Sequence, residues 1–170
     1  WIKGITWKQF IESKSIEDPT QNIKKLLSSI IDLHSASIHH GDIYPEIIII
    51  NDNGLVFIDI IELDESRYTP TYTPDNHENI SKASIDRYAI VKIISELSDL
   101  MQLTHLKKYV NELLELPEVS SQEIIKLHDE LDNIIIPTPL KLVNTFKIFH
   151  KSLPTKQNKL LSDDGRYYLD

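Results

Sequence analysis

The sequence contains no cysteine, only four glycines and no long apolar run. Without cysteine, disulfide bonds and Cys-ligated metal sites are excluded. The glycines stand at positions 4, 41, 54 and 165, too far apart to form a glycine-rich loop that cradles phosphate groups. No apolar stretch approaches the length of a membrane-spanning helix, and the first residues lack the charged-then-apolar pattern of a secretory signal. We therefore expect a cytoplasmic protein with no membrane association.

Acidic residues outnumber basic ones, 26 to 18, which gives a formal net charge of -8. A nucleic-acid-binding protein would favour a basic face, so we expect no nucleic-acid partner. The 170 residues suffice for one domain with a substantial core. Because the chain begins at Trp1 rather than at methionine, we expect it to be part of a longer protein.

Two acidic residues, Asp42 and Asp59, flank a predicted β hairpin. A run of four isoleucines, Ile47 to Ile50, predicts the first strand, and a second apolar run, Leu55 to Ile58, predicts the return strand. Between them, Asn51 to Gly54 has the composition of a hairpin turn. The hairpin should bring the two aspartates towards one end of the molecule, where paired carboxylates suit a divalent cation and the activation of a hydroxyl.

The segment from Leu33 to Asp59 resembles the catalytic loop and metal-binding segment of the protein-kinase-like fold. That family has the pattern His-Arg/Gly-Asp, then an Asn, then a hairpin that leads to Asp-Phe-Gly. The resemblance implies that Asp42 is the catalytic base, that Asp59 binds magnesium and that His40 supports the loop. It also implies ATP and Mg²⁺ as cofactors.

Two positions of this segment depart from the family pattern, and at a third the chain has the glycine form of that pattern. Ile47 replaces the Asn that holds the second magnesium, and an isoleucine cannot ligate a cation. Tyr44 replaces a Lys that steadies the transferred phosphate, which removes charge stabilisation of the transition state. Gly41 replaces the Arg that clamps a phosphorylated activation loop, which argues against switching by loop phosphorylation. Together, Tyr44 and Ile47 predict weak or absent catalysis.

Two helices are expected before this segment. Thr6 is a plausible N-cap for a short helix that ends near Ser13. The residues before it resemble the kinase hinge, although any strand-turn-helix unit would fit them equally well. Asp18 as cap and Pro19 at the first helical position predict a second helix, which carries an apolar stripe and runs to about Ser35.

The residues after the hairpin resemble the kinase activation segment. Ile60 to Asp75 has little apolar periodicity and predicts an irregular loop. Within it, Thr73-Pro74-Asp75 resembles the Ala-Pro-Glu that closes the kinase segment, and Tyr68 to Tyr72 resembles the Gly-Thr-x-x-Tyr before it. The resemblance gives either Thr69 or Thr71 the threonine role on the substrate side, and both remain open.

A second match begins at Asp86, where Asp86-Arg87-Tyr88 and an apolar helix as far as Leu97 resemble the kinase Asp-x-Tyr and the central helix of its larger lobe. The resemblance implies that Asp86 accepts hydrogen bonds from the backbone of the catalytic loop, as a buried carboxylate requires. Further helices are expected at about Thr104 to Leu116, Ser121 to Leu131 and Pro139 to Lys151, before a polar tail, Pro154 to Asp170.

The predicted fold class is therefore α+β: the C-terminal lobe of a protein-kinase-like domain, mainly α-helical with a small β hairpin. Residues 1–150 form this lobe and 151–170 a C-terminal tail. The N-terminal lobe is not covered and would come from the rest of the protein. A zinc site at His34, His39 and His40 is a weaker interpretation, since His40 matches the packing histidine of the kinase loop.

The resemblance predicts transfer of the γ-phosphoryl group of Mg-ATP to a Ser or Thr hydroxyl of a protein substrate, with degraded activity. A first alternative is a pseudokinase that binds a protein partner without chemistry. A second is a small-molecule phosphotransferase of the aminoglycoside-kinase type, since the His40-Gly41-Asp42 form is common there. The 69–75 segment and Asp86-x-Tyr88 favour a protein substrate over this second alternative.

Overall fold

The computed structural model describes residues 3–13, 16, 18–51, 54–59 and 68–135. The chain divides into two compact units, residues 1–135 and 136–170. The expected helix at Pro139 to Lys151, the tail, the domain boundary at residue 150 and the first part of the irregular loop lie outside the described residues. The first unit is mixed α+β and mostly helical, with a small antiparallel sheet.

Local capping chemistry defines the first two helices. Helix α1 spans Trp7–Glu12, and Thr6 is its N-cap, as the sequence predicted; the structure adds a capping box with Gln9. Helix α2 spans Pro19–Ser35, and the Asp18 side chain accepts a hydrogen bond from the Gln21 amide. Both predicted helix starts are confirmed.

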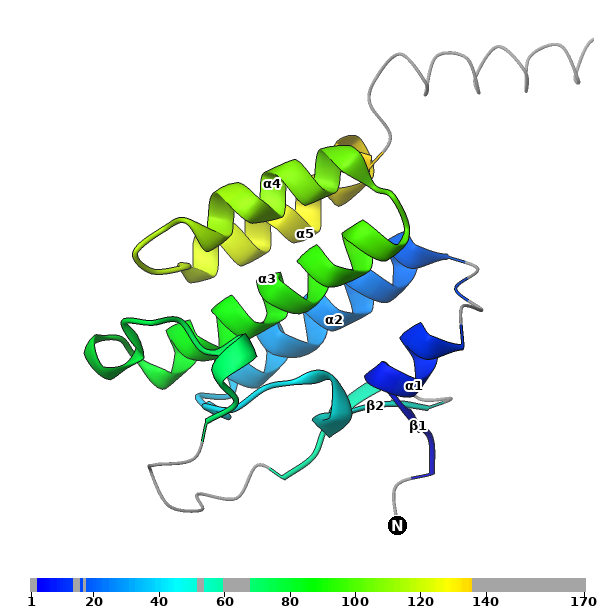
Figure 1. The fold of residues 1–170 in the computed structure, drawn as a ribbon. Helices are drawn as coiled ribbons and strands as arrows, with labels where there is room; N and C mark the ends of the chain where they lie inside the picture. The colour runs from blue at the N-terminus through cyan, green and yellow to red at the C-terminus, as the bar shows by residue number, and fades with distance from the viewer. Residues whose placement is uncertain (1–2, 14–15, 17, 52–53, 60–67, 136–170) are drawn as a thin grey trace, which may run out of the picture. The chain divides into compact units, whose positions relative to one another are not determined.

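Three further helices complete the helical layer. Helix α3 spans Lys82–Leu100, α4 spans Thr104–Leu114 and α5 spans Ser121–Ile135. Figure 1 shows α2 and α3 side by side, with α4 and α5 on one side of this pair and α1 and the strands on the other. Among the described helices, none combines the length and the apolar character needed to cross a membrane.

The predicted hairpin is present as β2, Ile48–Asn51, and β3, Gly54–Phe57, which pair antiparallel with Asn51 opposite Gly54. A third strand, β1, spans Ile5–Thr6 and pairs with the other side of β2, so the order is β1-β2-β3. This pairing was not predicted. It explains Gly4, because a Cβ there would clash with the Ile50 carbonyl oxygen.

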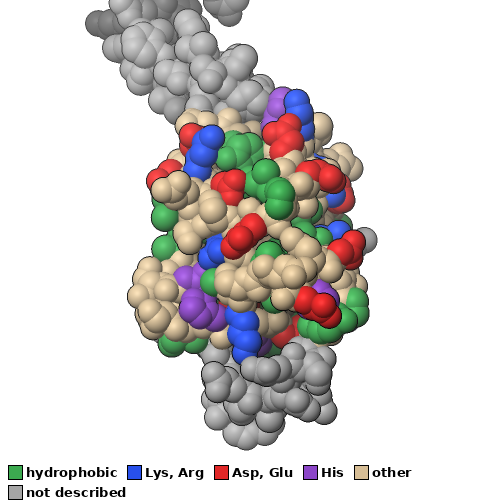
Figure 2. All heavy atoms as spheres, turned by 90° about the vertical axis from the view of Figure 1, so that its left-hand side faces the viewer, with side chains coloured by type: hydrophobic (Ala, Val, Ile, Leu, Met, Phe, Trp, Pro, Cys, Tyr) green, Lys and Arg blue, Asp and Glu red, His purple; other side chains and the backbone are tan. Residues whose placement is uncertain are grey.

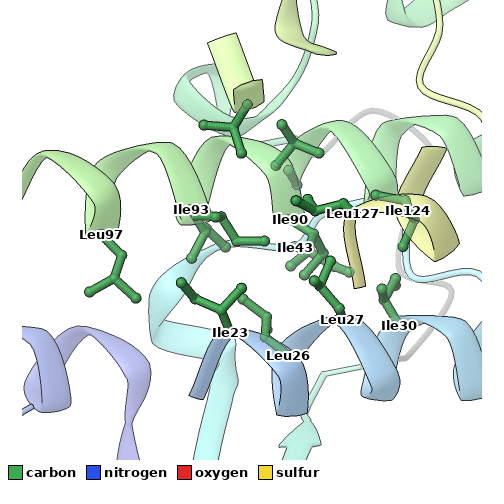
Figure 3. Packing of buried hydrophobic residues seen from close by; sticks show 14 of the residues in the cluster. Ile23, Leu26, Leu27, Ile30, Ile43, Ile90, Ile93, Leu97, Ile124 and Leu127 are labelled. Atoms are coloured by element: carbon green, nitrogen blue, oxygen red, sulfur yellow. The ribbon is translucent and has the colours of Figure 1, made fainter. Parts of the chain in front are cut away.

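The core is formed mainly by the facing sides of α2 and α3. In Figure 3, residues of α2 point towards residues of α3, Ile43 lies between the two helices, and α5 contributes from one end. Ten of these fully or almost fully buried side chains are labelled there: Ile23, Leu26, Leu27, Ile30, Ile43, Ile90, Ile93, Leu97, Ile124 and Leu127. Because Ile43 belongs to this core, packing fixes the chain on the C-terminal side of Asp42.

Candidate functional site

The candidate site is built on the loop of residues 36–44, which follows α2 directly. A Schellman motif ends the helix: Ser37 N–H donates to the His34 carbonyl and Ile38 N–H donates to the Leu33 carbonyl. Ser37 occupies the left-handed position, φ 58°, which glycine usually takes. The motif turns the chain sharply at the end of α2 and directs it into the 36–44 loop.

Asp86, near the start of α3, holds this loop from the inside of the protein. Its side chain is fully buried. Gly41 N–H donates to Asp86 Oδ1 at 2.6 Å, and His40 N–H donates to Oδ2 at 2.8 Å. The hydrogen bonds that the resemblance implied for Asp86 are thus present. The two amides satisfy a carboxylate that would otherwise be costly to bury.

His34 adds a third contact that the sequence did not indicate. Its Nε2 lies 3.1 Å from Asp86 Oδ2, and its ring lies 5.3 Å from that of the exposed His39. The position of His34 in the last turn of α2 was a signal that it faces the loop, but its partner is 52 residues away. The histidines do not converge on a common centre, since the described residues contain no group of three metal-ligating side chains.

His40 connects the loop to the hairpin. Its Nδ1 accepts a hydrogen bond from the Asp42 amide at 3.3 Å, so the proton of the neutral ring lies on Nε2. Nε2 can then donate to the Ile58 carbonyl at 2.9 Å. His40, two residues before Asp42, is therefore hydrogen-bonded to Ile58, the residue before Asp59.

Asp42 is half-buried, and its carboxylate meets the segment that follows the hairpin. Thr69 N–H donates to Asp42 Oδ1 at 2.7 Å. The Thr69 carbonyl in turn accepts from the Thr73 hydroxyl at 3.0 Å. The structure thus brings the Thr69 backbone to Asp42, whereas Thr71 is exposed to solvent.

The other two residues singled out in this segment, Pro74 and Asp75, do not reach Asp42 through any described contact. The Pro74 carbonyl accepts from His77 N–H at 3.0 Å and closes a local turn. Asp75 is exposed, and its charge helps to raise the pKa of Tyr88, after the larger effect of burial. Asp75 therefore lies within electrostatic reach of Tyr88 on α3.

Asp59 ends the return strand with an unusual backbone. Its φ is 62°, a left-handed conformation that few non-glycine residues adopt and that aspartate tolerates better than most. Such outliers gather at functional sites, which makes Asp59 a candidate on conformation as well as on sequence. Its side chain is exposed.

Tyr44 lies within the electrostatic influence of both candidate acids. Burial raises the pKa of the Tyr44 hydroxyl, and the charges of Asp42, Asp59 and Glu46 raise it further. Both aspartates are therefore within electrostatic reach of one phenol. The convergence of the two carboxylates at one end of the hairpin stays a prediction.

Ile47 contributes nothing polar to this site. Its side chain is 2% exposed and belongs to the core, while its carbonyl accepts the Ile58 amide at 2.9 Å. Only Asp42 and Asp59 therefore offer carboxylate oxygens at the positions that the resemblance indicates.

One polar pair beside the site was missed by the sequence reasoning. The Tyr72 hydroxyl donates to Glu96 Oε2 at 3.0 Å and joins the 69–75 segment to α3. Burial, the charge of Glu96 and this hydrogen bond raise the pKa of Tyr72 far above its ordinary value. No local pattern indicated the pair, because its members are 24 residues apart.

Comparisons of the chain with models of protein families, with curated proteins and with solved structures found no match. The functional assignment therefore depends on the site geometry and on the resemblance of residues 33–97.

On the face shown in Figure 2, histidine side chains gather beside a basic side chain, with acidic side chains nearby. A Cβ at Gly41 would lie 3.5 Å from the Lys82 side chain, so a lysine stands over the 36–44 loop.

Proposed function

We propose that this chain is the larger lobe of a protein-kinase-like domain with residual phosphotransfer to a protein Ser or Thr hydroxyl. The observation that carries the proposal is the pair of hydrogen bonds from the His40 and Gly41 amides to the buried Asp86. The resemblance implied this contact although His40 and Gly41 lie 46 and 45 positions before Asp86 in the sequence. A chance likeness of short motifs would not require it.

In this proposal Asp42 orients the acceptor hydroxyl and takes its proton. The carboxylate is suited to the task, because Asp86 and His40 hold the backbone on its N-terminal side and the buried Ile43 fixes the other. Asp59, in its left-handed conformation, would hold a magnesium ion. Magnesium is bound in many phosphotransfer sites by one or two carboxylates together with substrate phosphates, so this donor set fits it. The ion would neutralise charge on the transferred phosphoryl group.

The second candidate is a pseudokinase that binds a protein partner without chemistry. The Thr69 amide already occupies one oxygen of the Asp42 carboxylate at 2.7 Å. Tyr44 supplies no positive charge for a phosphate, and Ile47 is buried in the core. In a pseudokinase the site would have the same architecture but would catalyse no phosphotransfer.

The test is nucleotide binding by the full-length protein, measured calorimetrically with ATP in the presence and absence of Mg²⁺. Magnesium-dependent binding that Asp59→Ala abolishes would support residual phosphotransfer. Asp129→Ala is the matched control, because it removes an exposed aspartate from α5, away from the hairpin. Absence of ATP binding in both conditions would reject the kinase proposal and leave the pseudokinase.

Labelled ATP then separates the substrate classes. We expect transfer to a protein hydroxyl, and Asp42→Asn should remove it while ATP binding persists. Transfer to a small alcohol or an aminoglycoside, with no protein labelled, would instead indicate a small-molecule phosphotransferase.

A further inference from the structure

A pocket of ≈ 160 Å³ opens between α2, α3 and α5, separate from Asp42 and Asp59. Isoleucines of α2 and α5 form its apolar part, and Ile30 and Ile124 lie next to each other there at one end of the core (Figure 3). A cavity of about 150 Å³ in another protein accommodates a benzene ring. The pocket is thus large enough for a small organic molecule. Its polar lining includes His34, Arg87 and Ser121.

Arg87 is a buried cation with incomplete partners. Its side chain is 7% exposed. Nε donates to the Val119 carbonyl at 2.6 Å, and Nη2 donates to Ser84 Oγ at 2.8 Å. Among the described residues, Nη1 has only a long contact, 3.4 Å, to the hydroxyl of Ser121. Arg87 and Ser121 both line the pocket, and the Nη1 group and the Ser121 hydroxyl each have a hydrogen that can be donated to a further acceptor.

The charges around Arg87 do not fully offset its burial. The closest carboxylate is that of Glu118, whose Oε1 lies 3.7 Å from Arg87 Nη2. This carboxylate is half-exposed and also accepts a hydrogen bond from the Ser84 hydroxyl. Burial lowers the pKa of Arg87 even though Glu118, Asp86 and Glu123 act in the opposite direction. One additional negative charge near Nη1 would stabilise the guanidinium.

We propose that this pocket binds a small monocarboxylate with an aromatic or branched apolar body. The carboxylate accepts hydrogen bonds from Arg87 Nη1 and the Ser121 hydroxyl, since guanidinium groups favour carboxylates. The apolar body packs against the isoleucines. The proposal does not depend on phosphotransfer.

The pocket is connected to the 36–44 loop through His34. This residue lines the pocket and contacts Asp86, which accepts the amides of His40 and Gly41. A bound carboxylate near Arg87 changes the electric field at His34 and Asp86. We therefore expect the signals of the His40 and Gly41 amides to respond to occupancy of the pocket.

The test is an NMR titration of the ¹⁵N-labelled chain with benzoate, benzyl alcohol and benzylamine, which share a ring and differ in charge. Benzoate should bind with a Kd of about 1 mM, as expected for a ligand with few atoms. The alcohol and the amine should bind at least about ten times more weakly, because they lack the carboxylate. The Ser121, His40 and Gly41 amide signals should shift with benzoate. Equal binding of all three, or no shift at about 10 mM benzoate, would overturn the proposal.

Two tryptophan variants locate the site without disturbing Arg87, whose replacement could unfold the protein. Ile125→Trp enlarges a 44%-exposed residue that lines the pocket, and it should weaken benzoate binding at least about tenfold by filling the space. Leu100→Trp is the control, because Leu100 is 42% exposed and lies at the end of α3 outside the pocket.

Ser121→Ala should weaken benzoate binding about threefold to fivefold through the lost hydrogen bond. Unchanged benzoate binding by Ile125→Trp would show that the ligand sits elsewhere, and the proposal would be wrong.

Discussion

Replacement of Asp86 tests the central physical claim about the candidate site, which is that one buried carboxylate holds the 36–44 loop. Asp86→Ala removes the acceptor for the His40 and Gly41 amides and the partner of His34. Hydrogen bonds to a charged acceptor contribute about 1.5–3 kcal/mol each, and amides left without a partner add a desolvation cost. We expect the free energy of unfolding to fall by about 3–5 kcal/mol.

The loss should leave a folded protein. A unit of 135 residues has a stability of about 7–20 kcal/mol at typical values per residue. Asp86→Asn should have an intermediate effect, since its amide oxygen can accept one of the two backbone amides while its NH₂ group faces the other. Chemical denaturation measures the difference, and Asp99→Ala is the control on the same helix. Asp99 is exposed and pairs with Lys107 at the surface, so its loss should cost about 0.5 kcal/mol or less.

Amide hydrogen exchange shows whether the effect is local. In Asp86→Ala the His40 and Gly41 amides should lose their protection, while the amides inside α4 should keep theirs relative to global unfolding. The reasoning would be refuted by a stability loss below about 1 kcal/mol, or by unchanged protection of the two loop amides.

Three further predictions follow from the described geometry. Ser37 and Gln102 occupy left-handed positions at helix ends, with φ of 58° and 56°. Ser37→Gly and Gln102→Gly should therefore each raise the free energy of unfolding by about 0.5 kcal/mol and move the denaturant midpoint upwards. A lower midpoint would contradict the strain argument. The pKa of Tyr72 is raised in the folded protein. Below pH about 10, the pKa of tyrosine in the unfolded chain, Tyr72 contributes no pH dependence to stability. Above that pH the unfolded chain ionises first, so stability should fall until the pH reaches the pKa of Tyr72 in the folded protein. Tyr72→Phe should reduce this alkaline loss, and an unchanged slope of stability against pH would count against the burial of Tyr72 and its Glu96 contact. Ile47→Asn buries an amide in the core and should lower the free energy of unfolding by about 3 kcal/mol. If the variant folds and the missing magnesium ligand limits the reaction, phosphotransfer by the full-length protein rises. No gain in rate would implicate Tyr44 or the cleft instead.

Capping chemistry made the helix starts predictable from the sequence. Thr6 and Asp18 each bond to an amide three residues ahead, so all the information lies within one turn. Helix α3 starts earlier than the sequence match at Asp86 suggested, because Ser81 caps it through the Ser84 amide. Helices α4 and α5 end at Leu114 and Ile135 rather than at the expected Leu116 and Leu131. Helix ends carry weaker local signals and depend on packing.

Contacts between distant segments could not be predicted from local patterns. The pairing of β1 with β2 joins Ile5 to Ile50, and neither residue carries a mark of its partner. The Thr69 amide reaches Asp42 across 27 positions. The contact of Asp86 with the 36–44 loop was the exception, and it was accessible only because the resemblance to a known fold supplied the pairing.

The residues that hold the site and the residues that would perform its chemistry are different, and this decides which experiments are informative. Asp86, His34 and His40 satisfy buried polar groups, so the fold needs them whether or not a reaction takes place. Their presence supports the architecture and cannot separate a kinase from a pseudokinase. Asp59 is exposed and holds a left-handed backbone without a described structural partner, so the fold gains little from it. If Asp59→Ala leaves stability unchanged and removes magnesium-dependent ATP binding, the residue serves chemistry, and phosphotransfer becomes the better explanation of the site.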